Sequence, residues 1–328
     1  MIYRLLNNTD LSDLMVLWNH YALLENHQYK KMDLDEIKSH FYESHEKYQL
    51  ITYVGLENDI LVGFSSGVYA NHQNKAFLTH ILVDVEYRRK HIASDLLKLL
   101  ETSLKQHTEL ESIDINFFNP IKLNWIIPNK PFCEHPNAPG VDMENHGFAF
   151  MKSCGYIDYA YQNAYYRNLS DFSYRDEIKI LMEQITEKGI KISVFDSKRH
   201  FGFDELFDDL KSQAWKEEIQ NNINKPNGGN MVLIVEDNGK ICGFTGPLSV
   251  ENSKRGYFAG IGIHSHYRGF GLGKILFASL CMELKNIGAE YMTLFTGKNN
   301  PARKIYEKEG FQIVRSWSNM RKIIKLSD

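Results

Sequence analysis

The feature that most constrains the fold is a glycine-rich stretch, Ile261–Lys274, which has the pattern of a strand end, a tight turn and a helix start. An apolar run punctuated by small residues favours a buried strand, and its main members are Tyr257, Phe258, Ile261 and Ile263. After the turn, apolar residues recur every three or four positions, as in an amphipathic helix: Leu272, Ile275, Leu276, Leu280, Leu284 and Ile287. Gly288 follows as a C-terminal stop.

Three glycines, Gly269, Gly271 and Gly273, occupy the predicted turn. A backbone without Cβ atoms lets a ligand approach closely, and the free N–H groups and dipole of a helix start attract phosphate. The spacing matches neither the dinucleotide fingerprint Gly-x-Gly-x-x-Gly nor the phosphate loop that ends in Gly-Lys-Ser/Thr. Taken alone, the Arg-x-x-Gly-x-Gly pattern leaves two interpretations open: a phosphate seat, or a turn whose glycines merely permit tight packing.

A second pattern follows the long helix. A strand is predicted over Tyr291–Thr296, and a short helix follows it, with Pro301 near its start and Gly310 at its end. The pattern Asn-x-x-Ala-x-x-x-Tyr-x-x-x-Gly-Phe is matched by Asn299, Ala302, Tyr306, Gly310 and Phe311. The two patterns in this order resemble the signatures of the GCN5-related N-acetyltransferase (GNAT) family.

The resemblance implies an acetyl-CoA site, with acetyl-CoA as co-substrate and no metal. In that family the turn holds the pyrophosphate and the strand before it pairs with the pantetheine arm. The implied cofactor-binding residues are Ile261, Gly262, Ile263, Arg268, Gly269, Phe270, Gly271, Leu272, Gly273, Lys274 and Asn299. The family position of the acid that protonates the departing CoA thiolate is occupied by Tyr306, and a backbone N–H near 260–263 would stabilise the oxyanion. The alternative for Tyr306 is packing in the core.

The first half of the chain repeats the pattern, with Arg88 and Arg268 at equivalent positions 180 residues apart. The predicted order of a strand, two helices, three strands, a helix, a strand, a helix and a strand recurs in the second half. The predicted fold class is therefore α/β (α+β), with two tandem GNAT-like domains that each have a mixed central sheet flanked by helices. The predicted domains are 1–170 and 171–328. This arrangement is similar to that of mycothiol synthase, which supports no particular substrate.

The two copies are not equal. The first copy has His91, Ala93, Met151 and Glu144 where the second has Gly271, Gly273, Tyr306 and Asn299. We therefore expect the first domain to fold like the second but to lack catalysis. It also contains an insertion, 119–143, with five prolines. Such a loop is either a functional lid or a surface excursion without a role.

The general base cannot be identified from the sequence. Four residues lie in or beside the relevant strands, namely Glu236, Glu251, His264 and His266. Each is interpreted as a surface residue, and deprotonation of the amine through water is the alternative. In the first copy, His80 either faces a substrate cavity or is a buried, hydrogen-bonded core residue, and we favour the second interpretation.

Composition excludes some partners. The net charge of −3 and pI near 6.5 predict no general attraction to nucleic acid or to a membrane surface. Four scattered cysteines suit a reducing compartment, and the N-terminus lacks an apolar signal segment. No apolar run approaches the length of a membrane span. We expect a cytoplasmic protein.

The predicted function is the transfer of an acetyl group from acetyl-CoA to a primary amine of a small molecule or peptide, by direct attack in the second domain. One alternative is a non-catalytic acyl-CoA-binding regulator or scaffold, and another is a transferase of a longer acyl group. The identity of the acceptor amine and the oligomeric state are left open by the sequence.

Overall fold

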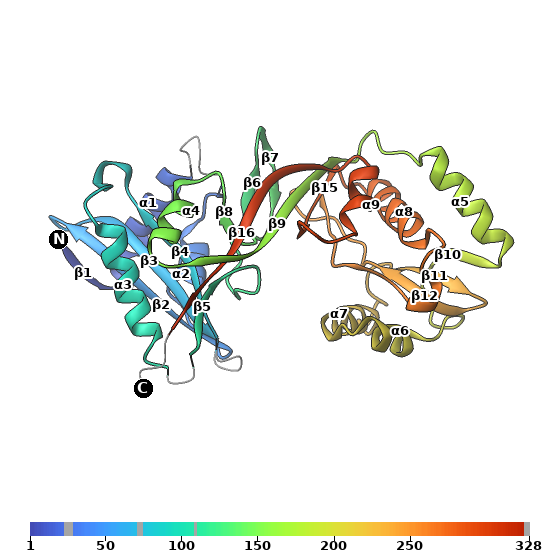
Figure 1. The fold of residues 1–328 in the computed structure, drawn as a ribbon, viewed down its shortest axis with the longest axis horizontal. Helices are drawn as coiled ribbons and strands as arrows, with labels where there is room; N and C mark the ends of the chain where they lie inside the picture. Colours follow the sequence, from blue (N-terminus) through green and yellow to red (C-terminus); the bar gives the residue numbers. More distant parts are fainter. Residues whose placement is uncertain (23–28, 71–74, 108–109, 325–328) are drawn as a thin grey trace. The chain divides into compact units, whose positions relative to one another are not determined.

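A computed structural model describes residues 1–22, 29–70, 75–107 and 110–324, which form two compact units (Figure 1). Unit 1 comprises Met1–Ala164 and Arg315–Asp328, and unit 2 comprises Tyr165–Val314. The chain passes between the units twice, inside β9 (Ile157–Asn168) and inside β16 (Gln312–Ile323). The domain boundary expected at 170 stays a prediction, but the compact units differ from it because the last strand belongs with unit 1 from Arg315 onward.

Unit 1 is built on a sheet in the order β1-β2-β3-β4-β5-β16-β9, in which β4 and β5 are parallel. Its strands are β1 (Ile2–Leu5), β2 (Tyr48–Glu57), β3 (Ile60–Ala70), β4 (Lys75–Val83), β5 (Ser112–Ile115), β6 (Trp125–Ile127), β7 (Lys130–His135) and β8 (Val141–Asp142). Its helices are η1 (Asn8–Asp10), α1 (Leu11–Tyr21), α2 (Leu34–Phe41), η2 (Val85–Tyr87), α3 (Ile92–Leu104) and α4 (His146–Ser153).

Local sequence explains several of these boundaries. A capping box between Asp33 and Glu36 starts α2, because each side chain accepts a hydrogen bond from the other residue's backbone N–H. The tight turn between β2 and β3 has Asn58 and Asp59 at φ 51° and 64°, the left-handed conformations that a two-residue hairpin needs. The sheet is covered by α1 and α2 on one face and by α3 on the other, which buries nearly the whole of β3.

The insertion 119–143 is not a loose surface excursion. It forms the β6–β7 hairpin, and β8 pairs with β16. Ile121 and Leu123 join the core that contains Trp18, and Trp125 is 1% exposed. The interpretation of this segment as a surface excursion is therefore wrong, and its role as a lid stays a prediction.

Unit 2 has an antiparallel sheet in the order β10-β11-β12-β14, and its β15 lies between β9 and β13 in the large sheet, with β13 and β15 parallel. Its strands are β10 (Ile190–Val194), β11 (Leu233–Asp237), β12 (Lys240–Thr245), β13 (Arg255–Gly256), β14 (Ile261–Ile263) and β15 (Tyr291–Gly297). Its helices are α5 (Asp176–Glu187), α6 (Phe203–Leu210), α7 (Gln213–Ile223), η3 (Ser265–Tyr267), α8 (Leu272–Asn286) and α9 (Arg303–Lys308).

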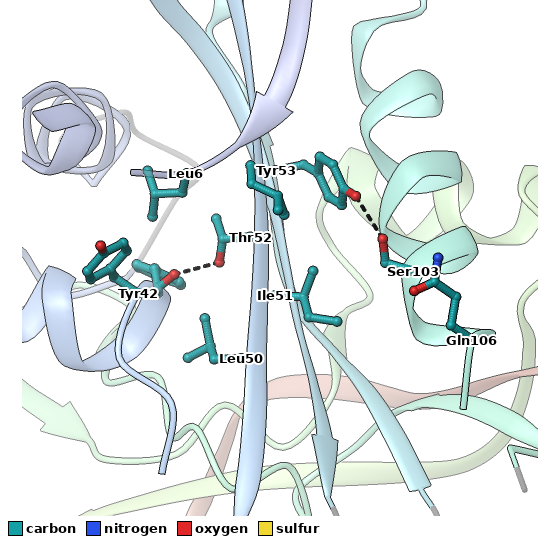
Figure 2. A pocket seen from close by; sticks show the side chains of 10 residues that line it. Leu6, Tyr42, Leu50, Ile51, Thr52, Tyr53, Ser103 and Gln106 are labelled. Atoms are coloured by element: carbon teal, nitrogen blue, oxygen red, sulfur yellow. Dashed lines mark hydrogen bonds between the residues drawn. The ribbon is translucent and has the colours of Figure 1, made fainter. Parts of the chain in front are cut away.

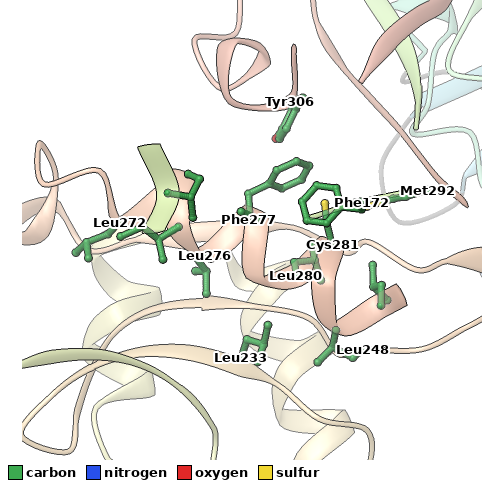
Figure 3. Close-up of a cluster of buried hydrophobic side chains, with 14 of the residues drawn as sticks. Phe172, Leu233, Leu248, Leu272, Leu276, Phe277, Leu280, Cys281, Met292 and Tyr306 are labelled. Atoms are coloured by element: carbon green, nitrogen blue, oxygen red, sulfur yellow. The ribbon is translucent and has the colours of Figure 1, made fainter. Parts of the chain in front are cut away.

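Two cores cover the two faces of the unit 2 sheet. On one face the apolar side of α8 packs with α5, α9 and the strands, and Figure 3 shows Leu276, Phe277 and Leu280 in this core. On the other face, α6 and α7 pack against β11 and β12. Both units thus have the predicted mixed sheet flanked by helices, with matching element order. The predicted fold class is confirmed.

Candidate active site

The glycine turn has the predicted form. After η3, the backbone takes left-handed conformations at Gly269 (φ 92°) and Gly271 (φ 76°), and α8 begins at Leu272. A side chain at Gly271 would also meet Leu181, whose Cδ1 lies 3.2 Å from an added Cβ. The first α8 hydrogen bonds run from the N–H groups of Lys274 and Ile275 to the carbonyl of Gly271. The N–H groups ahead of these are the ones that a helix start leaves free for an anion.

Gly273 separates the two interpretations of the turn. Its φ is not positive, and a Cβ there would lie 3.5 Å from Ile305 and 3.9 Å from Ile263, which is ordinary contact. Neither backbone strain nor packing within the chain therefore requires glycine at this position. A ligand that closely approaches the first turn of α8 would require it, so Gly273 favours the phosphate seat over the packing turn.

The strand before the turn changes partners. At Arg255 and Gly256, β13 pairs with Tyr291 and Met292 of β15, whereas β14 pairs with β12. The N–H of His264 donates to the Cys242 carbonyl at 2.9 Å. Backbone N–H and C=O groups alternate in direction along an antiparallel strand. Those of Ile261 and Ile263 therefore point away from β12, toward the edge of β14 that does not pair with β15. An extended amide-containing chain could pair there.

Arg268 does not present a free charge. Its Nε donates to the Ile263 carbonyl at 3.1 Å, and its Nη2 lies 3.9 Å from a carboxylate oxygen of Asp209. Asp209 also accepts hydrogen bonds from the backbone and hydroxyl of Ser265, which lower its pKa. Arg268 therefore ties the turn to the end of β14 in this structure.

The cation at Lys274 is also paired. Its Nζ lies 2.9 Å from Glu177, which Lys308 approaches to 3.7 Å and Arg175 to 3.1 Å. The hydrogen bond from Lys274, followed by that from Arg175, lowers the pKa of Glu177 to about 2. Nearby, Lys188 Nζ lies 4.7 Å from the ring centre of Phe270, which is 45% exposed. Arg175 also pairs with Glu309 at 2.6 Å, so the cations beside the turn are held by two carboxylates.

Tyr306 lies in the core on α9, next to Phe277 in Figure 3. Its ring centre is 4.7 Å from that of Phe277 and 6.3 Å from those of Phe258 and Tyr165. Burial, with a smaller effect of Tyr165, raises the pKa of Tyr306 to about 12. The phenol therefore keeps its proton at neutral pH, which suits a proton donor as well as a packed ring.

Asn299 is exposed, and within the described residues its side chain makes no hydrogen bond. The neighbouring Asn300 makes the local contacts, because its Oδ1 accepts from the Ala302 N–H at 3.0 Å and its Nδ2 donates to Thr296 Oγ1 at 2.9 Å. Asn299 is thus left available to a ligand, while Asn300 shapes the start of α9.

Two of the four candidate bases, both carboxylates, are paired with other side chains, and one of the two histidines is buried. Glu236 accepts from Ser193 and lies 3.3 Å from Nε2 of the buried His200. Glu251 pairs with the buried Arg255. His264, expected at the surface, is 8% exposed because it packs between β12 and η3, and His266 is exposed. None of these observations favours one of the four as the base.

Two side chains of α7 that sequence reasoning missed contact the segment between β13 and β14. Trp215 Nε1 on α7 donates to the Ala259 carbonyl at 3.2 Å, and the Tyr257 hydroxyl donates to Glu218 Oε1 at 3.2 Å. Trp215 and Glu218 are three residues apart and so share one face of α7. No sequence signal shows which strand that face covers.

Unit 1 has its own version of the turn and one cavity away from it. The Arg88 Nε donates to the Val83 carbonyl at 3.2 Å, as Arg268 donates to the Ile263 carbonyl in unit 2.

His80, favoured as a core residue, is half-buried with its ring centre 5.0 Å from those of Trp18 and Tyr29. An open cavity of about 420 Å³ lies between β2, α2 and the end of α3, lined in part by Thr52, Tyr53 and Ser103 (Figure 2).

No helix in the described part of the chain combines the length and apolar character needed to cross a membrane. The described residues also contain no group of three or more His, Cys, Asp or Glu side chains placed to hold a metal ion.

Comparison with solved structures finds the same fold over nearly the whole chain. A GCN5-related glucosamine N-acetyltransferase region in a fungal multi-domain GH3 beta-N-acetylglucosaminidase matches with a TM-score of 0.70 and 15% identity, covering 98% of this chain and 38% of that protein. A tandem GNAT protein from the clavulanic acid biosynthesis pathway matches with a TM-score of 0.62 and 13% identity, covering 100% and 99%. A GCN5-related N-acetyltransferase from Sphaerobacter thermophilus matches with a TM-score of 0.64 and 12% identity, and the match covers 99% of this chain and 96% of that protein.

No curated protein matches the chain in sequence. The family model described as the acetyltransferase (GNAT) family matches twice, at residues 15–120 and 197–311, which together make up more than half of the chain. The two matches fall in the two halves that carry the repeated turn, which confirms the tandem arrangement. The chain belongs to the GNAT acetyltransferase family.

Proposed function

We propose that the protein is an acetyl-CoA-dependent N-acetyltransferase whose working site is in unit 2. The observation that carries the proposal is the departure of β14 from β15, directly before a glycine turn that opens α8. This arrangement offers backbone groups of Ile261 and the Ile263 N–H for the amides of pantetheine, while the Ile263 carbonyl is bonded to Arg268, and free N–H groups for pyrophosphate. Gly273, which the chain's own packing does not require, supports contact with a ligand at this point.

The proposal gives the co-substrate one orientation. Pyrophosphate is held at the start of α8, so an arm running along β14 toward Ile261 brings the thioester to the segment 257–260. The acceptor is a primary amine of a small molecule or peptide, which attacks the thioester carbonyl directly. Tyr306 contacts Phe258 of this segment and donates a proton to the departing thiolate sulfur. A backbone N–H near Gly260 stabilises the oxyanion.

A non-catalytic acyl-CoA-binding regulator is the second candidate. It needs the same seat for CoA but no proton donor, and the buried, protonated Tyr306 beside segment 257–260 favours the enzyme. A transferase of a longer acyl group shares all the features above and differs only in the space beyond the thioester.

The test is acetyl transfer by the full chain to a panel of amines, amino acids, aminoglycosides and peptides, together with calorimetric titration with CoA. We expect CoA binding and acetylation of at least one class of amine. Binding without turnover of any amine would favour the regulator. Faster transfer from a longer acyl-CoA than from acetyl-CoA would favour a transferase of a longer acyl group. Absence of CoA binding would refute the proposal.

A further inference from the structure

The segment between β13 and β14 lies between two polar side chains on opposite faces of the sheet. Successive residues of an extended segment point to opposite faces. Phe258 packs on the α8 side, with its ring centre 5.9 Å from that of Phe277 and 6.3 Å from that of Tyr306. Tyr257 reaches the other way, and its hydroxyl donates to Glu218 of α7. A phenol therefore lies on one side of the segment and a carboxylate on the other.

The carboxylate is held in place by its surroundings on α7. Trp215, one turn earlier, donates to the Ala259 carbonyl and lies directly on Gly260, where an added Cβ would come within 2.3 Å of its Nε1. This contact fixes α7 against the segment. Glu218 is half-buried, and one hydrogen bond from Tyr257 leaves most of the acceptor capacity of a carboxylate unused.

The other carboxylate that acts on Tyr257 is already engaged. The charged groups acting on Tyr257 are Glu218, Arg255 and Glu251, and the last two pair with each other. Burial, with a further contribution from Glu218, raises the pKa of Tyr257 to about 12. Tyr257 therefore stays a neutral donor, and Glu218 is the carboxylate left to receive a cation.

We propose that Glu218 binds the acceptor as an alkylammonium cation and takes its proton, with Trp215 and Tyr257 as aromatic walls of the site. This rests on the proposed function. Aromatic faces beside a carboxylate are a favourable environment for an ammonium group. The substrate class is thus a cationic primary amine, and an amine without positive charge at neutral pH is a poor acceptor.

The proton steps balance. Glu218 takes the ammonium proton, and the freed nitrogen lone pair forms the N–C bond while the C=O π electron pair moves onto oxygen. When the C=O bond re-forms, the electron pair of the C–S bond leaves on sulfur. The second nitrogen proton goes to water, and the thiolate takes a proton from the Tyr306 hydroxyl, which water restores. Glu218 then loses its proton to solvent, so that one proton is released per transfer.

The test compares Glu218→Gln with Glu217→Gln in the full chain, using the best amine of the panel. Glu217 is the adjacent exposed carboxylate, bonded only to Gln213 within the described residues. For Glu218→Gln we expect kcat/KM for the amine to fall by about 100-fold or more, with CoA affinity and Tm unchanged. The loss should shrink at high pH, where the amine loses its proton to water. Glu217→Gln should match the parent.

Three results would overturn the inference: normal kcat/KM in Glu218→Gln, the same loss at all pH values, or a loss of CoA affinity equal to the loss of rate. The last two would show that the residue supports the fold. Failure of the parent to bind CoA would instead refute the proposed function, so the two failures are distinguishable.

Discussion

The two units build the same turn from different residues. In unit 1, Arg89 and His91 have φ 63° and 62°, where unit 2 has Gly269 and Gly271 at 92° and 76°. Each turn follows a short 3-10 helix and is tied back by an arginine Nε, Arg88 in unit 1, to the last carbonyl of a strand. The backbone path alone therefore does not demand glycine. The difference between the units lies in the first turn of the helix that follows, α3 in unit 1 and α8 in unit 2.

The first helical turn after the turn carries different side chains in the two units. The first turn of α3 carries Asp95, which accepts a hydrogen bond from the Tyr3 hydroxyl at 2.9 Å. The equivalent residue of α8 is Ile275, which is fully buried. A carboxylate near a helix N-terminus uses the positive end of the dipole that would otherwise attract phosphate. This difference supports the prediction that unit 1 folds like unit 2 but lacks catalysis.

The sharpest test of this difference is Gly271→Trp. We expect it to remove measurable CoA binding in calorimetry, because a bulky side chain forced into a left-handed conformation against Leu181 displaces the turn. His91→Trp is the matched control, and it should leave CoA affinity unchanged. If the control weakens CoA binding as much as Gly271→Trp does, unit 1 contributes to the site.

A second comparison uses equivalent residues of the two short helices, Tyr306 of α9 and Met151 of α4. Tyr306→Phe should lower kcat by about 10²–10⁴-fold, because a positioned proton donor is lost, while CoA affinity stays the same. Met151→Leu, a swap of similar volume at a residue 3% exposed, should leave kcat unchanged. An unchanged kcat for Tyr306→Phe at saturating substrate would mean that the phenol only packs.

A reciprocal exchange at the first helical turns gives a smaller effect. Gly273→Ala should weaken CoA binding without lowering Tm, since the new Cβ makes only ordinary contacts within the chain. Ala93→Gly in unit 1 should lower stability by up to about 1 kcal/mol and create no CoA site. Calorimetry and thermal unfolding distinguish the outcomes, and equal CoA affinity in Gly273→Ala and the parent would remove the ligand explanation for this glycine.

The smallest expected effect concerns the stability of the fold at low pH. The folded-state pKa of Glu177, lowered to about 2 chiefly by the hydrogen bond from Lys274, lies below the ordinary glutamate value of 4.5. Its pairing therefore stabilises the fold above the unfolded pKa, and this contribution is lost as pH falls through the folded value. Because Glu177 is exposed, the effect is modest. Tm measured from pH 6 to pH 2 should fall less steeply in Glu177→Gln than in the parent, and parallel curves would contradict this.

Local signals predicted much of the molecule because turns and helix ends depend on neighbouring residues. The hairpin at Asn238 and Gly239, the glycine turn and the repeat all have such signals. The departure of β14 from β15 was implied only by the family resemblance, since the same apolar run suits one continuous strand. The place of Glu218 depends on how α7 lies against segment 257–260, which no local pattern contains. Likewise, β16 is a clear strand in sequence, but its pairing with β5 of unit 1 is a long-range property.

The central claim, that one of two similar units holds the co-substrate, is tested most directly by the stoichiometry of CoA binding to the full chain. Calorimetric titration should give one site per chain in the parent and in His91→Trp, and none in Gly271→Trp. Two equal sites in the parent, or one site that survives Gly271→Trp, would contradict the account.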